Sequence, residues 1–339
     1  MALNSFTVAT IARQLKGISD AVINDCELTK YLKDKGLISF NNGGDGFDLR
    51  LRSSRSAIGG ATEDFGSNTA ATVSPFVKVS GVYKKYRWDL FESLLQEERN
   101  KNAPSEAKMF DMIMEDLNEV KQAAADRLAT HLYGDGATQS TGDVSATAPM
   151  LGLEAIIDDD NTYLGVARSS NTYIQAQIKT STGSTFDQDT DNNGVAQGIQ
   201  DMDELFVSCS KGAASDGGSI RPDLNTTKDS PDYFIGSSTN WRRYCRCLQA
   251  QRMYTDAKQD SEQTITYQSR PFKWDTYCTA DRIYFLNSKH LNLDIIPSQL
   301  LVSLPPILTQ NPLGRIHVIY TQGAFYSRNP RYLGAIRTS

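Results

Sequence analysis

The longest periodic stretch of this sequence runs from about residue 105 to residue 132, and it has the pattern of one continuous amphipathic helix. Ser105 is a candidate N-cap, and Glu106 lies in the first turn, where a negative charge is favourable. Apolar residues recur along one stripe at Phe110, Ile113, Leu117, Val120, Ala124, Leu128 and Leu132. At 1.5 Å per residue such a helix is about 40 Å long, which is long for an enzyme domain. We expect the stripe to be buried against a central sheet.

Two predicted strands precede this helix and are joined by a long polar connection. Residues 47–52 alternate apolar and charged side chains, and residues 75–88 are rich in β-forming residues. The sequence between them, residues 53–74, is polar and contains glycine. The pattern predicts a projecting hairpin without an obvious apolar face to bury in its own domain. Because isolated two-stranded ribbons are marginal in water, we expect this hairpin to find a partner elsewhere.

The N-terminal part is predicted to contain two helical pieces and a short strand. The first helix begins near Val8, and the second carries Leu28, Tyr31 and Leu32 and stops at Lys35-Gly36. Residues 37–40 read as a strand, and residues 90–95 as a short helix. Periodicity alone favours packing of the N-terminal helices on their own domain, and an arm that lies on a neighbouring subunit is the alternative.

The C-terminal half is predicted to mix helices and strands without internal repeats or coiled-coil heptads. The helices are expected at residues 199–209 and from Trp241 onward, the latter capped by Ser238, Thr239 or Asn240. The strand-like segments are residues 171–179, 231–237, 264–270, 272–278, 282–287, 291–295 and 317–321. This mixture predicts an α+β fold.

Composition and charge argue against several classes of function. The net charge is −5 and no block of basic residues occurs, which argues against tight binding to DNA or RNA. The first 30 residues lack the apolar core of a signal peptide, and no run of 18 apolar residues is present. We therefore expect a chain that is neither exported by that route nor inserted in a membrane.

The residues that could carry chemistry do not form a convincing site. The sequence has five cysteines, an odd number, and no C-x-x-C motif, so we interpret them as free thiols of a cytosolic protein. Residues 189–194 match the first half of an EF-hand loop, but Gln200 stands where a bidentate glutamate is needed. The acids Asp158, Asp159 and Asp160 are adjacent, which favours capping and turn hydrogen bonds over metal binding. We predict no catalytic, cofactor-binding or metal-binding residues, and no cofactor.

The segment from residue 152 to residue 170 follows the long helix and its Gly134-Asp135-Gly136 turn, and it carries a specific motif. The motif is GL-x-x-I-(I/V)-D-x-D-N-T-Y-x-G-(I/V)-x-R, matched at Gly152, Leu153, Ile156, Ile157, Asp158, Asp160, Asn161, Thr162, Tyr163, Gly165, Val166 and Arg168. This block resembles the major capsid proteins of tailed bacteriophages of the Hong Kong 97 type. Further matches run from about residue 105 to residue 335, among them residues 231–237, 282–287 and 317–331.

The resemblance implies a particular domain organisation and function. It implies an N-terminal arm at residues 1–36, an extended β-hairpin loop at 37–90 and a peripheral domain with a spine helix at 91–150. Residues 151–270 would form mainly the axial domain, and residues 271–339 would return to complete both domains. The expected function is structural: hexamers and pentamers of one chain form an icosahedral head that encloses double-stranded DNA without sequence-specific binding.

The resemblance also implies partners and leaves alternatives open. The expected partners are a scaffolding protein, a portal and decoration proteins. The helix near Val8 leaves no room for a long N-terminal scaffolding segment, so we expect either a separate scaffolding protein or a chain that has already been processed. The expected location is the virion, after assembly in the host bacterial cytoplasm. Lys78, Lys84 and Lys85 are candidate cross-linking lysines, but no partner asparagine can be matched, so cross-linking is not inferred. A cellular nanocompartment shell of the same fold and an enzyme are the competing readings.

Overall fold

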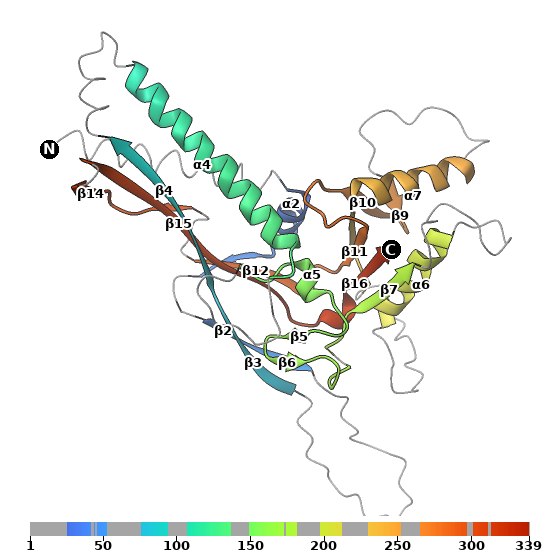
Figure 1. Cartoon of the computed structure of the whole chain (residues 1–339). Coiled ribbons are helices and arrows are strands. Elements are labelled where there is room, and N and C mark those ends of the chain that lie inside the picture. The colour runs from blue at the N-terminus through green and yellow to red at the C-terminus, as the bar shows by residue number, and fades with distance from the viewer. Residues whose placement is uncertain are drawn as a thin grey trace, which may run out of the picture.

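The computed structural model describes residues 26–41, 44, 46–52, 76–93, 107–136, 149–172, 174–181, 197–211, 230–251, 265–296, 301–310 and 313–338. These residues form a mixed α+β molecule in which two six-stranded sheets meet end to end and a long helix extends along the first of them (Figure 1). The predicted α+β class is confirmed.

The first sheet is organised around its longest strand, β15 (Leu313–Ser327). The strand β4 (Lys84–Ser93) pairs antiparallel along one side of β15. The other side of β15 is occupied in turn by β12 (Leu291–Ile296), β13 (Val302–Ser303) and β14 (Ile307–Gln310). The short strand β1 (Ile38–Phe40) adds to β12 in parallel.

The long helix α4 (Ala107–Tyr133) lies along this sheet, as its apolar stripe predicted (Figure 1). Of the stripe, Val120, Ala124, Leu128 and Leu132 are buried. Ser105 and Glu106 lie outside the described residues, as do the side chains of Phe110, Ile113 and Leu117. Between the helix and the sheet is an apolar cavity of about 30 Å³, whose lining includes Leu128 and Ile295. A space of that size is enough for a water molecule but not for a substrate.

The second sheet has the strand order β7-β16-β11-β8-β10-β9. Its strands are β7 (Gln177–Ser181), β8 (Tyr233–Gly236), β9 (Ile265–Tyr267), β10 (Arg270–Trp274), β11 (Arg282–Leu286) and β16 (Gly334–Thr338). Helices α6 (Gln197–Lys211) and α7 (Ser238–Gln251) cover one face, where Phe234, Phe272 and Phe285 form a separate aromatic core. Side chains of the other face, including Ile235 and Tyr284, join the larger core beneath α4. Adjacent residues of one strand therefore serve two cores, as the alternation of a strand requires.

The predicted hairpin is present as a ribbon of β2 (Gly46–Arg52) and β3 (Phe76–Val82), paired along its whole length. The expectation that it has no apolar face to bury in its own domain was wrong. Leu49, Leu51 and Val79 are buried, and the ring of Phe47 stacks on Tyr326 of β15 at 4.5 Å. The tip, residues 53–75, lies outside the described residues. The base of the ribbon is therefore part of the subunit's own core.

The second N-terminal helix packs on its own chain. Helix α2 (Glu27–Asp34) buries Leu28, Tyr31 and Leu32. It is followed by Gly36, whose φ of 66° is readily adopted by glycine. The first predicted helix, from Val8, lies outside the described residues.

Three local predictions need correction. Residues 90–93 were expected in a helix, but they belong to β4, because they pair with residues 314–317 of β15. Helix α7 starts at Ser238 instead of Trp241, and Ser237 Oγ accepts the Asn240 backbone N–H at 3.4 Å as its cap. The strand expected at residues 171–179 starts only at Gln177.

Candidate functional site

The motif segment, residues 152–168, lies where α4 and the two sheets meet. It begins with Gly152, which packs against the end of α4: a Cβ there would come within 2.2 Å of the Gly134 carbonyl oxygen and 2.4 Å of the His131 carbonyl oxygen. Only glycine tolerates such an approach of two backbones. The short helix α5 (Leu153–Ile156) follows directly.

A tight hairpin follows α5. Strands β5 (Thr162–Tyr163) and β6 (Val166–Ala167) pair across Leu164 and Gly165, whose φ values of 48° and 82° are both left-handed. Two successive positive φ values are typical of a two-residue hairpin turn, which explains the glycine of the motif. The turn therefore lies at residues 164 and 165. Asn161-Thr162-Tyr163 reads as a turn in the sequence, but Thr162 and Tyr163 form β5.

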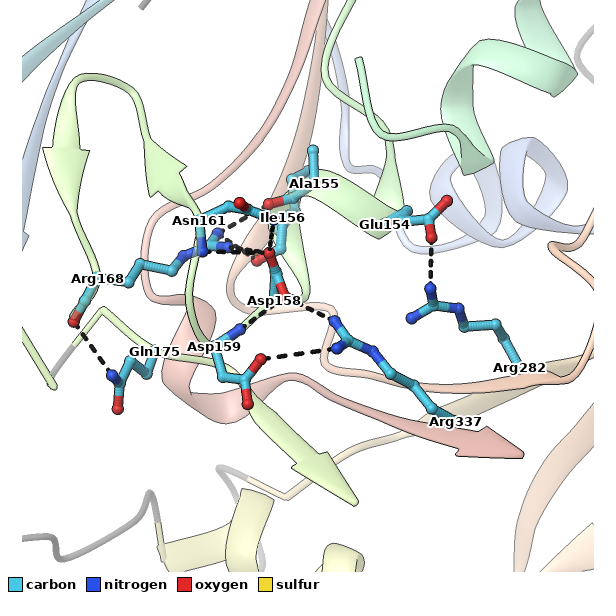
Figure 2. A network of polar contacts seen from close by, with 10 residues as sticks. All are labelled: Glu154, Ala155, Ile156, Asp158, Asp159, Asn161, Arg168, Gln175, Arg282 and Arg337. Atoms are coloured by element: carbon cyan, nitrogen blue, oxygen red, sulfur yellow. Dashed lines mark hydrogen bonds and ion pairs between the residues drawn. The ribbon is translucent and has the colours of Figure 1, made fainter. Parts of the chain in front are cut away.

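The guanidinium of Arg168 occupies the centre of this segment, with none of its surface exposed. Its Nη2 donates to the carbonyl oxygens of Ala155 at 2.9 Å and Ile156 at 2.8 Å, which are terminal carbonyls of α5 (Figure 2). Its Nη1 lies 3.8 Å from Asp158 Oδ2, and its Cζ lies 5.0 Å from the centre of the Tyr163 ring. Burial lowers the pKa of Arg168 to about 10, so the side chain remains charged at neutral pH.

Asp158 is the counter-ion, and it is shared with the C-terminal strand. Its Oδ1 accepts the backbone N–H of Asp159 at 3.0 Å and Nη2 of Arg337, on β16, at 2.6 Å. Its Oδ2 accepts the backbone N–H of Asn161 at 3.3 Å. Burial by itself would raise the pKa of Asp158, but hydrogen bonds from Arg337 and Asn161 outweigh burial and lower it. The carboxylate is therefore ionised at neutral pH.

The same segment is tied to both sheets by further polar contacts. Glu154 forms an ion pair with Arg282 of β11, in the second sheet (Figure 2). The Tyr163 hydroxyl donates to the Ser327 carbonyl oxygen at 2.9 Å and accepts the Ser327 backbone N–H at 2.8 Å, at the end of β15 in the first sheet. Since it contacts α4 and both sheets, the motif segment fixes their mutual placement.

This arrangement is suited to holding the fold together. The expected capping and turn bonds of Asp158 are present, but its ion pairs with Arg168 and Arg337 are additional and were not predicted. Asp159 lies 3.8 Å from Arg337, so two of the three adjacent acids face one arginine. Across the described residues, no group of three or more His, Cys, Asp or Glu side chains is placed to hold a metal ion. Residues 189–194 lie outside the described residues, and Gln200 is in α6.

A second buried carboxylate joins parts of the chain that the sequence did not connect. Asp275, just after β10, accepts the Glu27 backbone N–H at 2.8 Å, the Tyr133 hydroxyl at 2.8 Å and the Cys26 thiol at 3.2 Å. It therefore caps the N-terminus of α2 and binds the end of α4 at the same time. No local pattern could reveal this, because Asp275 and Cys26 are 249 residues apart.

The five cysteines form no disulfide bonds, in agreement with the interpretation of the sequence. Burial, together with the Asp275 carboxylate, raises the pKa of Cys26 to about 12, so the thiol is protonated and unreactive at neutral pH. Of the candidate lysines, Lys78 pairs with Asp48 at 2.8 Å, and Lys84 and Lys85 begin β4. None of the described helices combines the length and apolar composition that a bilayer crossing requires.

Comparisons with known proteins point to one fold. No protein-family model and no curated protein sequence matches this chain. The cyanophage A-1(L) capsid asymmetric unit matches with a TM-score of 0.58 and 13% identity, over 90% of this chain and 92% of that chain. The capsid of an empty GTA particle matches with a TM-score of 0.53 and 12% identity, over 91% and 89%. The holo-SrpI encapsulin complex of Synechococcus elongatus PCC 7942 matches with a TM-score of 0.52 and 10% identity, over 91% and 86%.

These three likenesses each extend over most of both chains. At this level of identity they concern the fold, and they agree with the motif resemblance at residues 134–168. The chain therefore has the α+β fold of Hong Kong 97-type capsid proteins.

Proposed function

We propose that this chain is the shell subunit of a tailed-bacteriophage head, which self-assembles into an icosahedral container for double-stranded DNA. The observation that carries the proposal is the match over 90% of this chain to a phage capsid subunit, at a TM-score of 0.58. The motif at residues 134–168, which resembles the phage proteins, supports the same function.

The surface of the chain also supports assembly. Large apolar side chains are exposed, among them Phe76 at 53%, Ile307 at 53% and Leu308 at 69%. Apolar groups left in water on a subunit of this size favour contacts with further copies.

The parts of the subunit are assigned as follows in this proposal. The first sheet with α4 forms the peripheral domain, and the second sheet with α6 and α7 forms the axial domain around five- and six-fold axes. The ribbon of β2 and β3 is the base of the extended loop, whose tip reaches a neighbouring subunit. Scaffolding, portal and decoration proteins would be its partners, and assembly would take place in the host bacterial cytoplasm. The packaged DNA would be held without sequence-specific contacts.

A nanocompartment shell is the second candidate, because an encapsulin also matches with a TM-score of 0.52. The phage function is preferred since the phage capsid has the higher TM-score and the motif segment resembles that branch. Both candidates are structural proteins, and we propose no enzymatic activity.

The test is electron microscopy of the expressed chain, alone and together with the neighbouring genes of its source genome. Closed shells are expected, and a portal at one vertex or packaged DNA would identify a phage head. Shells that instead enclose one particular protein would favour the nanocompartment. A chain that stays monomeric under all assembly conditions would refute both.

A further inference from the structure

Exposed apolar side chains gather at the end of the first sheet that points away from the second sheet, where β14 pairs with the beginning of β15 (Figure 1). The described residues include nine large apolar side chains that are exposed, and four of them lie here: Phe91, Leu304, Ile307 and Leu308. The other five are spread over β1, β3, α6 and β10. We call the group of four the β14 corner.

The strand register extends the corner into a continuous strip. Phe91 of β4 pairs with Ile316 of β15, and Ile316 pairs in turn with Ile307 of β14. Tyr86 of β4 points towards α4, where its hydroxyl lies 3.0 Å from His131 Nδ1. Because side chains alternate along a strand, Phe91 and its row face the opposite side of the sheet. The strip therefore lies on the face that α4 does not cover.

Strand β14 is open on both faces. Ile307 belongs to the strip, whereas its neighbour Leu308 points to the α4 side and is still 69% exposed. Within the described residues β14 pairs with β15 alone, so no described strand lies along its outer side. Its sequence, Ile-Leu-Thr-Gln, contains neither a charge nor a proline, the residues that usually protect an edge strand from pairing. The corner therefore has the chemistry of a contact surface.

The charges beside the corner are balanced within the subunit. Arg87 and Asp89 lie on the same face as the strip, and their side chains pair with each other at 2.6 Å. On the other face, Arg315 of β15 stands opposite Leu308 on one side and opposite Glu92 of β4 on the other. Two copies of the corner can therefore approach each other without like-charge repulsion.

We propose that the β14 corner of one copy docks on the β14 corner of a second copy in an adjacent ring of the shell. The inference deepens the proposed function and rests on it. With the second sheet around the five- and six-fold axes, the opposite end of the subunit, with β14, lies at the outer rim of each ring (Figure 1). Copies from adjacent rings reach that rim, and burial of apolar surface favours their contact. The matching surface is another corner, because the remaining exposed apolar side chains of the described residues are scattered.

The size of the corner predicts a weak contact. A standard stable interface takes about 20–30 residues from each partner, and the corner offers fewer. A single corner contact therefore does not hold two isolated subunits together. It becomes effective when rings present several corners at once, because linked contacts reinforce one another. Loss of the corner should consequently leave rings intact and prevent their closure into shells.

The test places a charge on the corner without changing a buried residue. Leu308→Glu and Ile307→Glu replace side chains that are more than half exposed, so both variants should fold, as circular dichroism of the subunits verifies. Each should lower the yield of closed shells in electron microscopy about tenfold, because carboxylates would meet in an apolar contact. Native mass spectrometry should still find rings at the level of the parent. Leu308→Met, which stays apolar, is the matched control and should form shells.

Crosslinking identifies the partner surface directly. In assembled Leu308→Cys, a short bismaleimide should join position 308 of one copy to position 308 of a second copy, as peptide mapping can verify. The parent is the control, because it has no thiol at this position. A crosslink from position 308 to another surface of the chain, to a different protein or to nothing would show that corners do not meet.

Different outcomes overturn different statements. If Leu308→Glu closes into shells as the parent does, the corner contact is wrong while the shell function stands. If Leu308→Glu folds but loses rings as well as shells, the placement of the contact between rings is wrong. If the parent forms flat sheets of joined rings and the crosslink still forms, the shell function fails while the corner contact stands. A parent that stays monomeric refutes both.

Discussion

Arg168 offers the sharpest test of the motif segment, because its side chain is fully buried and binds three other groups. In Arg168→Met the side chain keeps its length and its packing on Tyr163 but loses its charge and its donors. The carbonyl oxygens of Ala155 and Ile156 then lose the Nη2 donor, and Asp158 loses one of its two cationic neighbours.

The magnitude follows from these contacts. An unsatisfied buried acceptor costs about 1–3 kcal/mol, and removal of one partner from a buried ion pair costs about 3–5 kcal/mol. The two costs overlap in part. The variant also no longer has to bury a charge, which offsets some of the loss, so we expect the free energy of unfolding to fall by about 3–5 kcal/mol. For a chain of 339 residues, 4 kcal/mol corresponds to a fall in Tm of about 6 °C.

Urea unfolding of the unassembled subunit, followed by circular dichroism, measures this loss. Arg168→Lys is the graded control, because it keeps the charge but not the planar fork that reaches two carbonyls, and it should lose about half as much. Arg127→Met, on an exposed position of α4, should change the free energy of unfolding by less than about 0.5 kcal/mol. If Arg168→Met is within about 1 kcal/mol of the parent, the buried arginine does not hold the segment together and our reasoning is wrong.

Four further predictions concern stability and assembly. The pKa of Asp158 is lower in the folded subunit, so its ionised form stabilises the fold above about pH 4 and this contribution disappears as the pH falls further; the destabilisation by Asp158→Asn should therefore shrink below pH 4 in urea titrations. Leu128→Ala, in the buried stripe of α4, should cost about 2–5 kcal/mol and yield little soluble subunit; normal particle yields would argue against the packing of α4. Deleting residues 56–71, the ribbon tip, should leave the circular dichroism spectrum intact but lower particle yield, whereas unchanged yields would remove the tip from the list of subunit contacts. Chelators should leave the melting temperature of the particles unchanged, and a drop that calcium reverses would show a metal site.

The sequence by itself determined the helices and strands that depend only on residues close together along the chain. The stripe of α4 follows from apolar residues at helical spacing, and Val120, Ala124, Leu128 and Leu132 are buried as that spacing requires. The alternation at residues 47–52 predicted the first strand of the ribbon, β2. Each of these depends on residues within a few positions of one another.

The local sequence pattern did not predict the structure correctly where pairing with a distant strand decided between helix and strand. Leu90 and Phe91 suit a helix or a strand equally well, and ten consecutive residues of β4 paired with β15 decided for the strand. The apolar face of the ribbon was likewise hidden in the sequence, since Phe47 finds its stacking partner in Tyr326. Tertiary context overrides propensity in such short segments.

Only the tertiary structure decided how the polar residues combine. Asp158 and Arg337 are 179 residues apart and Cys26 and Asp275 are 249 apart, and no periodicity links such pairs. A motif identifies the residues of one segment. Its buried charged residues also need partners from distant parts of the chain, because burying an unpaired charge strongly destabilises the fold. The motif therefore indicated the fold, and the meeting of the two sheets decided which arginine, tyrosine and carboxylate hold that fold together.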